Sequence, residues 1–134
     1  MRNVIYYIQD MSQLGTANDN QILNIGRLLS DAYTNDKVTF LRKIKVDSAE
    51  YFNKLITSQL KPAIPRLVFT NIGMLQEPQF TLNAARFLVD YTIDNTVVLY
   101  WPYFVKDGNT LSWDNTYNNS IKFENTVSLE RMDT

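Results

Sequence analysis

Two short apolar runs separated by a helix-like segment constrain the fold of this chain more than any other feature of its sequence. The runs are Leu67–Phe69 and Val97–Trp101, and each is apolar on consecutive residues, without alternation. Consecutive apolar residues are typical of strands that are covered on both faces, as in a parallel sheet. A strand, a helix and a second parallel strand form a right-handed crossover unit. We therefore expect residues 66–102 to form the centre of an α/β domain.

The flanking segments continue this alternation of strands and helices. Short β-branched and aromatic runs predict strands at Val4–Ile8, Val38–Ile44 and Ile121–Phe123. Apolar residues recur at helical spacing over Ile22–Ala32 and again over Tyr51–Ile56, which predicts two helices. Strands that alternate with helices in this way predict a parallel sheet.

The sequence changes character after Pro102. Asp107-Gly108, between two apolar stretches, predicts a β-hairpin, and the tail from Ser128 is expected to fray. The strands and helix expected inside the central unit are Arg66–Asn71, Leu82–Tyr91 and Thr96–Trp101. Together the segments predict one domain over residues 1–134: a three-layer α/β fold with a mainly parallel sheet of about five strands and a C-terminal hairpin.

Composition narrows the class of protein. A chain of 134 residues, 45% apolar and 20% charged, has the size and make-up of one globular domain. The net charge of -1 gives no basic excess for nucleic acid, and no apolar run approaches the roughly 20 residues of a membrane span, so we expect a cytoplasmic protein. The chain has no Cys and no His, which excludes thiol chemistry, histidine-based triads and the commonest zinc ligands.

The loop after the first strand has the position of a P-loop, whose pattern is G-x-x-x-x-G-K-[ST]. The eight residues from Asp10 fill that spacing, but only Gly15 matches it. Asp10 replaces the first glycine, Thr16 replaces the lysine and Ala17 replaces the hydroxyl that binds Mg²⁺. The cation and the metal ligand are therefore missing, and a carboxylate repels phosphate. We favour a P-loop-NTPase-like fold with a degenerate loop; the alternative is an ordinary turn in another doubly wound fold.

The strand that would carry the Walker B carboxylate lacks it. The apolar run ends in Thr70, Asn71, Ile72 and Gly73, none of which is charged. Since Mg²⁺ is held in such sites by a carboxylate at this position, neither a metal nor nucleotide hydrolysis is expected. The sequence predicts a chain without a cofactor and without enzymatic activity.

Aromatic residues gather near the carboxyl end of the last main strand. They are Tyr100, Trp101, Tyr103, Trp113 and Tyr117. Ligands of open α/β sheets bind beyond the carboxyl ends of the strands, where aromatic rings stack on a base or anchor a partner protein. The alternative, and the commoner role of such residues, is to pack the hairpin onto the sheet.

Charged residues offer weaker candidates. The carboxylates of Asp90, Asp94, Asp107 and Asp114 lie in expected turns and helix ends, where Asp is common for local hydrogen bonding rather than catalysis. Arg42, Lys43 and Lys45 form a short basic run, which we interpret as a solvated strand edge; a phosphate-contacting patch is the alternative.

Four segments resemble a known family: Leu67–Pro78 (LVFTNIGMLQEP), Leu82–Leu88 (LNAARFL), Asn95–Trp101 (NTVVLYW) and Leu111–Trp113 (LSW). They are similar to BrxF, the small P-loop protein of type 3 bacteriophage-exclusion (BREX) defence systems. In that family an apolar strand ends in Asp-Asn-Ile-Glu, an L-F-x-P element and a Leu-rich helix follow, and N-R-T-V-V leads to a Trp-containing turn. The amino-terminal part resembles the family only in its order of elements.

The chain departs from this family at the nucleotide site. The family's Walker lysine aligns with Thr16, its Walker B aspartate with Thr70 and its acidic residue after the strand with Gly73. The resemblance therefore implies a nucleotide-binding fold without the nucleotide machinery.

Three functions remain open from the sequence. The first is a non-catalytic, P-loop-like interaction subunit of a phage-defence or mobile-element system, whose partners are other protein subunits or a second copy, with no direct contact to nucleic acid or membrane. The second is a small-ligand or nucleotide-binding protein that uses the aromatic strand ends, and the third is a nucleic-acid-binding module. The candidate binding residues are Asp10, Gly15, Thr16, Asn71, Trp101, Tyr103 and Trp113.

Overall fold

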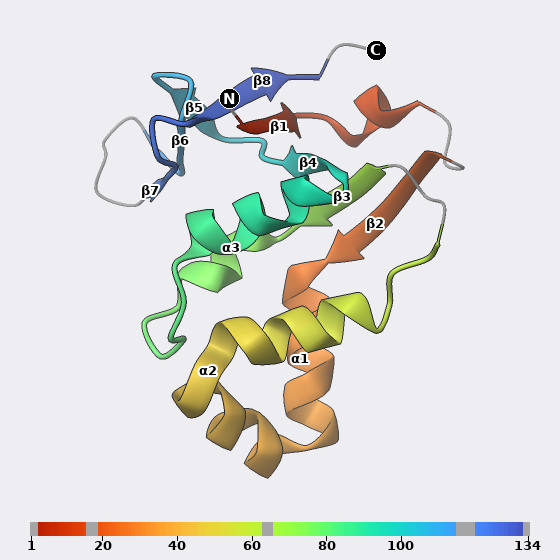
Figure 1. Cartoon of the computed structure of the whole chain (residues 1–134), viewed down its shortest axis with the longest axis vertical. Coiled ribbons are helices and arrows are strands. Elements are labelled where there is room, and N and C mark those ends of the chain that lie inside the picture. Colours follow the sequence, from red (N-terminus) through yellow and green to blue (C-terminus); the bar gives the residue numbers. More distant parts are fainter. Residues whose placement is uncertain (1–2, 16–18, 63–65, 115–119, 133–134) are drawn as a thin grey trace.

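The computed structural model describes residues 3–15, 19–62, 66–114 and 120–132, and it has an α/β fold (Figure 1). Five parallel strands form the main sheet in the order β2-β3-β4-β1-β8. Their bounds are β1 Asn3–Ile8, β2 Asn20–Asn24, β3 Arg66–Thr70, β4 Thr96–Tyr100 and β8 Val127–Arg131. The prediction of a mainly parallel sheet of about five strands is therefore confirmed.

Two α-helices lie between β2 and β3 in the chain, and a third lies between β3 and β4. They are α1 Ile25–Asn35, α2 Lys37–Thr57 and α3 Ala84–Asp90, with short 3₁₀ turns η1 Met11–Leu14, η3 Ile72–Gln76 and η4 Tyr91–Ile93. A small antiparallel sheet holds β5 Phe104–Lys106, β6 Thr110–Ser112 and β7 Ser120–Lys122. Asp107 (φ 57°) and Gly108 (φ 70°) form the turn between β5 and β6, which confirms the predicted hairpin. In the described parts of the chain, no helix is long and apolar enough to cross a bilayer.

All three α-helices cover one face of the main sheet. The large core joins buried side chains of α1, α2 and α3 to Phe69 of β3 and Leu99 of β4, and it also takes in Leu111 and Ile121 of the small sheet. The other face has a smaller core, in which Leu14 of η1 covers one residue each of β1, β3 and β4. The predicted third layer of helices is therefore wrong for the described residues.

The crossover rule explains this distribution. The steps from β2 to β3 and from β3 to β4 each move one position in the same direction, whereas the step from β1 to β2 moves three positions in the opposite direction. Crossovers of one hand place connections that run in opposite directions on opposite faces. The helical connections accordingly share one face, and η1, on the connection from β1 to β2, lies on the other.

The predicted strand Val38–Ile44 is wrong, because this segment belongs to α2. The Asp36 carboxylate caps the helix by accepting a hydrogen bond from the Thr39 backbone N–H (3.0 Å). Phe40 and Ile44, four residues apart, are buried, so the helical period governs burial here and overrides the β-propensity of the valine. The basic run of residues 42–45 consequently lies on an exposed helix surface rather than on a strand edge.

The predicted helix over Ile22–Ala32 is wrong at its start and correct from Ile25. Gln21 and Leu23 are buried while Ile22 between them is 52% exposed, which is the alternation of a strand, β2. The Asn24 side chain then caps α1 by accepting from the Arg27 N–H (3.0 Å).

The expected fraying from Ser128 is also wrong. Val127–Arg131 forms β8 and pairs in parallel with β1 over five residues, from Asn3↔Val127 to Tyr7↔Arg131. The buried side chains of Val127 and Leu129 join the large core, and the Leu129 N–H donates to the Gly108 carbonyl (2.8 Å). The carboxyl-terminal strand thus joins the small sheet to the main sheet.

Candidate functional site

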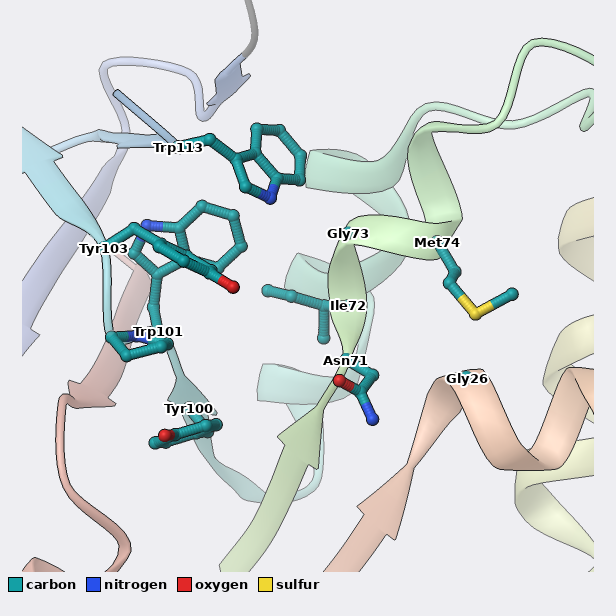
Figure 2. Close-up of a pocket in the computed structure, with 10 residues that line it drawn as sticks. Gly26, Asn71, Ile72, Gly73, Met74, Tyr100, Trp101, Tyr103 and Trp113 are labelled. Carbon is teal, nitrogen blue, oxygen red and sulfur yellow. The ribbon is translucent and has the colours of Figure 1, made fainter. Parts of the chain in front are cut away.

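A hollow of about 380 Å³ opens beyond the carboxyl ends of β3 and β4, beside the start of α1 (Figure 2). It is lined by Gly26, Asn71, Ile72, Gly73, Met74, Tyr100, Trp101, Pro102, Tyr103 and Trp113. A second hollow of about 460 Å³ lies between α2 and α3, at the amino end of β4, and includes Tyr91 and Asp94. Since ligands of open α/β sheets bind at the carboxyl ends of the strands, the first hollow is the candidate site; we call it the aromatic pocket.

Trp101 anchors the aromatic wall of this pocket. Its ring is buried and meets Tyr103 and Trp113 edge to face, with centroid distances of 5.1 and 4.9 Å. Its indole N–H donates to the carbonyls of Phe104 (3.0 Å) and Ser112 (3.3 Å). Trp101 therefore packs the small sheet onto the main one, as the commoner interpretation of the aromatic residues predicted. Tyr103, which is 46% exposed, and half-buried Trp113 carry the wall to the surface.

Asn71 forms the floor of the pocket. It follows β3 directly and has a left-handed backbone (φ 55°), which asparagine tolerates better than most residues. Its amide Nδ2 donates to Asn24 Oδ1 (2.8 Å), the same oxygen that accepts from the Arg27 N–H. Because that backbone donor requires an oxygen from Asn24, Asn71 must offer its NH₂ group there. The Oδ1 of Asn71 is left on the pocket side (Figure 2).

Two glycines allow the walls to approach one another. A Cβ on Gly73 would lie 2.6 Å from Cζ2 of Trp113, closer than any real contact. A Cβ on Gly26 would lie 2.9 Å from Sδ of Met74 and 3.2 Å from the Cβ of Asn71. Gly73 therefore has no room for a side chain, whereas the nearest atom to Gly26 is the end of the flexible Met74 side chain, and neither glycine has an unusual backbone.

The tripeptide Asn-Ile-Gly occurs twice, at residues 24–26 and 71–73. The first copy begins on the last residue of β2, and the second directly follows β3. The two strands, β2 and β3, are neighbours, and Asn24 pairs with Thr70 in their register. The repeat therefore brings both asparagines and both glycines to one edge of the sheet, with Ile25 and Ile72 buried beneath. Sequence reasoning missed Asn24, Gly26 and Met74, and this repeat is the feature that points to the first two.

The loop after β1 is arranged for local capping. Asp10 caps η1 by accepting from the Ser12 N–H (2.9 Å), while Gln13 accepts from the Asp10 N–H (3.1 Å). The hydrogen bond from the Ser12 backbone lowers the pKa of Asp10 below its ordinary value. Gly15 ends η1 with φ 73° and ψ −135°, a conformation suited to glycine.

The predicted binding residues fall into two groups. Asn71, Trp101, Tyr103 and Trp113 line one pocket together, whereas Asp10 and Gly15 do not line it. Thr16 lies outside the described residues. The next described element after Gly15 is the strand β2, and α1 begins only at Ile25, so the expected helix does not open directly from this loop. One hydrogen bond, from Gln9 Nε2 to the Tyr103 carbonyl (3.0 Å), joins the segment before η1 to the pocket wall.

The side chains that line the aromatic pocket are uncharged. None of its lining residues carries a charge at neutral pH, so no side chain there supplies a carboxylate or a cation. Among the residues that the structure describes, no group of three or more acidic side chains could hold a metal ion. The aromatic walls and the few polar atoms are suited to binding a planar ring.

Comparisons of this chain with models of protein families, with curated proteins and with solved structures found no match.

Proposed function

We propose that this protein is a non-catalytic binding protein that holds a small planar ligand in the aromatic pocket. The observation that supports this proposal is the convergence of Trp101, Tyr103 and Trp113 around an open hollow at the carboxyl ends of β3 and β4. Aromatic rings in such a place gain binding energy by stacking on or packing against a planar ring. This is the second function left open by the sequence, the one that uses the aromatic strand ends.

The P-loop-like character and the role as an interaction subunit in phage defence stay predictions from the resemblance to BrxF. Calorimetry with MgATP tests them, since a degenerate P-loop is expected to give neither heat of binding nor turnover. Micromolar binding accompanied by hydrolysis would contradict both predictions and the absence of catalysis.

The two tryptophans of the chain make the binding proposal easy to test. Trp101 and Trp113 are the only tryptophans in the sequence and both line the aromatic pocket, so tryptophan fluorescence, excited at a wavelength that tyrosine does not absorb, reports on this site. Titration with small planar compounds, such as indole, adenine and adenosine, is expected to change the emission in a saturable way for at least one of them.

A matched pair of variants separates binding in the pocket from binding elsewhere. Tyr103→Ala is expected to weaken any such binding at least tenfold, because it removes one wall of the pocket. Tyr33→Ala changes a tyrosine of similar exposure (40% against 46%) on α1, outside the lining, and is expected to leave binding unchanged. Equal effects of the two substitutions, or no saturable change with any compound, would refute the proposed function.

A further inference from the structure

We infer that the ligand of the aromatic pocket is an uncharged nitrogen heterocycle with a hydrogen-bonding edge, such as a purine base or its nucleoside, bound without a phosphate. This inference rests on the proposed function and specifies the ligand class of the same pocket. It is drawn from the charge of the lining, from the polar atoms left open on it and from its size.

The charge of the lining argues against a phosphate. A phosphate group in a protein is held by arginine, lysine or the free N–H groups of a helix amino terminus. No lining residue is cationic. Two helix amino termini meet the pocket. That of α1 is capped by Asn24, whose Oδ1 accepts from both Arg27 N (3.0 Å) and Asn71 Nδ2 (2.8 Å), and that of η3 is a 3₁₀ turn of only five residues, which has a small dipole. An uncharged ligand would bring no such requirement.

Three polar atoms on the lining favour a ligand with its own donors and acceptors. The Trp113 indole N–H, the Tyr103 hydroxyl and the Asn71 Oδ1 come from three separate segments, and Figure 2 shows them on the pocket side. In the described part of the chain none of these atoms makes a hydrogen bond, in contrast to the Trp101 indole N–H, which has two acceptors. They offer one donor, one acceptor and one group that is both. The edge of a nitrogen heterocycle matches such a set, and a hydrocarbon ring does not.

The size of the hollow agrees with a single base or nucleoside. Its volume of about 380 Å³ is near the lower end of the range for ligand pockets, roughly 300–1,000 Å³. Tyr103 and Trp113 stand nearly perpendicular to the Trp101 ring, at 77° and 70°, so they present faces and edges at different angles to a planar guest. Stacking on an aromatic residue is tolerant of the base, and the polar atoms would supply selectivity.

The experiment compares five probes by tryptophan fluorescence and by calorimetry: adenine, adenosine, AMP, ATP and indole. Indole has the shape of a purine and an N–H donor but lacks the ring-nitrogen acceptors. Adenine or adenosine is expected to bind at least tenfold more tightly than AMP, ATP or indole. Tighter binding of AMP or ATP, or equal binding of indole, would overturn the ligand class and leave the proposed function standing. The absence of a saturable response to every probe would refute both the ligand class and the proposed function.

A single-atom variant tests the polar edge without disturbing the fold. Tyr103→Phe keeps the ring and removes the hydroxyl, so adenosine binding is expected to weaken about tenfold while indole binding stays the same. Tyr33→Phe on α1 is the matched control and is expected to change neither affinity. Native affinity for adenosine in Tyr103→Phe, or an equal loss for indole, would overturn the inferred role of the hydrogen-bonding edge.

Discussion

The Trp113 ring lies against the backbone of Gly73 with no room for a side chain, because a Cβ there would lie 2.6 Å from the ring carbon Cζ2. Gly73 belongs to η3, just after β3, whereas Trp113 directly follows β6 of the small antiparallel sheet. This contact therefore fixes the distance between the two walls of the aromatic pocket.

The substitution Gly73→Ala tests this contact. The new methyl group would displace the Trp113 ring, and because the edge-to-face pair with Trp101 would be lost, the near-ultraviolet circular dichroism of the tryptophans is expected to change. Gly26→Ala is the matched control, since its Cβ would meet the Sδ of Met74, the mobile end of a flexible side chain, at 2.9 Å. A native near-ultraviolet spectrum in Gly73→Ala would contradict the observed packing.

A glycine-to-alanine substitution at Gly15 is expected to have a different effect from the one at Gly73. A Cβ at this position would meet no atom within 4 Å, yet its φ of 73° is one that side chains rarely adopt. Gly15→Ala is expected to lower the free energy of unfolding by about 1–3 kcal/mol through backbone strain alone. Urea unfolding measures this cost, and the near-ultraviolet spectrum of the tryptophans should remain native. A substitution without cost would mean that the loop turns in another way.

The side-chain oxygen of Asn24 accepts two hydrogen bonds, one from the Arg27 N–H of α1 and one from the Asn71 amide. Asn24→Ala removes the cap of α1 and the acceptor for Asn71, so we expect a loss of about 1–2 kcal/mol in the free energy of unfolding. Asn24→Asp keeps an oxygen for both donors and is expected to stay close to native stability. Equal losses in the two variants, measured by urea unfolding, would show that the hydrogen bonds contribute little.

Local sequence patterns predicted the centre of the fold correctly. The strands β1, β3 and β4, the helix α3 and the Asp-Gly hairpin all lie where their apolar runs and turn residues place them. In these segments the spacing of the apolar residues and the position of the turn residues indicate the same element, and tertiary packing favours that element too.

The errors arose where two local preferences compete. Residues 38–44 contain a β-branched and aromatic run, but Asp36 begins a helix just before it, and the cap together with burial of Phe40 and Ile44 decides the outcome. At β2 a five-residue strand leads into α1 without a loop, so the apolar positions of strand and helix merged into one apparent helical period. The place of β8 depends on pairing with β1, far away in sequence, which no local pattern shows.

The sequence predicted some of the residues that line the aromatic pocket and missed others. Residues at the carboxyl ends of parallel strands meet at one edge of the sheet, which brought Asn71 and Trp101 together as expected. The P-loop spacing around Asp10 and Gly15 relied on a helix directly after the loop, whereas the next element in the described part of the chain is the strand β2. The contribution of α1 through Gly26 depends on the exact place where β2 ends, and that boundary was the one misjudged.

The cap of α2 gives a prediction about pH. Hydrogen bonds from the Thr39 hydroxyl (2.7 Å) and the Thr39 N–H (3.0 Å) lower the pKa of Asp36 below its ordinary value of 3.8. A carboxylate with a lowered folded-state pKa contributes stability that is present above 3.8 and is lost as the pH falls through the folded-state value. Native protein is therefore expected to exceed Asp36→Asn in urea midpoint at neutral pH, and the difference should shrink in acid. The control is Asp31→Asn, an exposed change on α1; a difference for Asp36→Asn that does not vary with pH would contradict the role of the charge.

The last strand provides the sharpest test of the topology. Leu129 is 6% exposed and belongs to the large core, and its N–H donates to the Gly108 carbonyl. Leu129→Ala is expected to lower the free energy of unfolding by about 2–5 kcal/mol, the cost of removing a buried leucine side chain. Glu130→Ala alters the exposed neighbour and is expected to stay within about 0.5 kcal/mol of native. Urea unfolding of the two variants separates the possibilities, because a frayed tail would make both substitutions neutral, whereas a fifth parallel strand beside β1 makes only the first one costly.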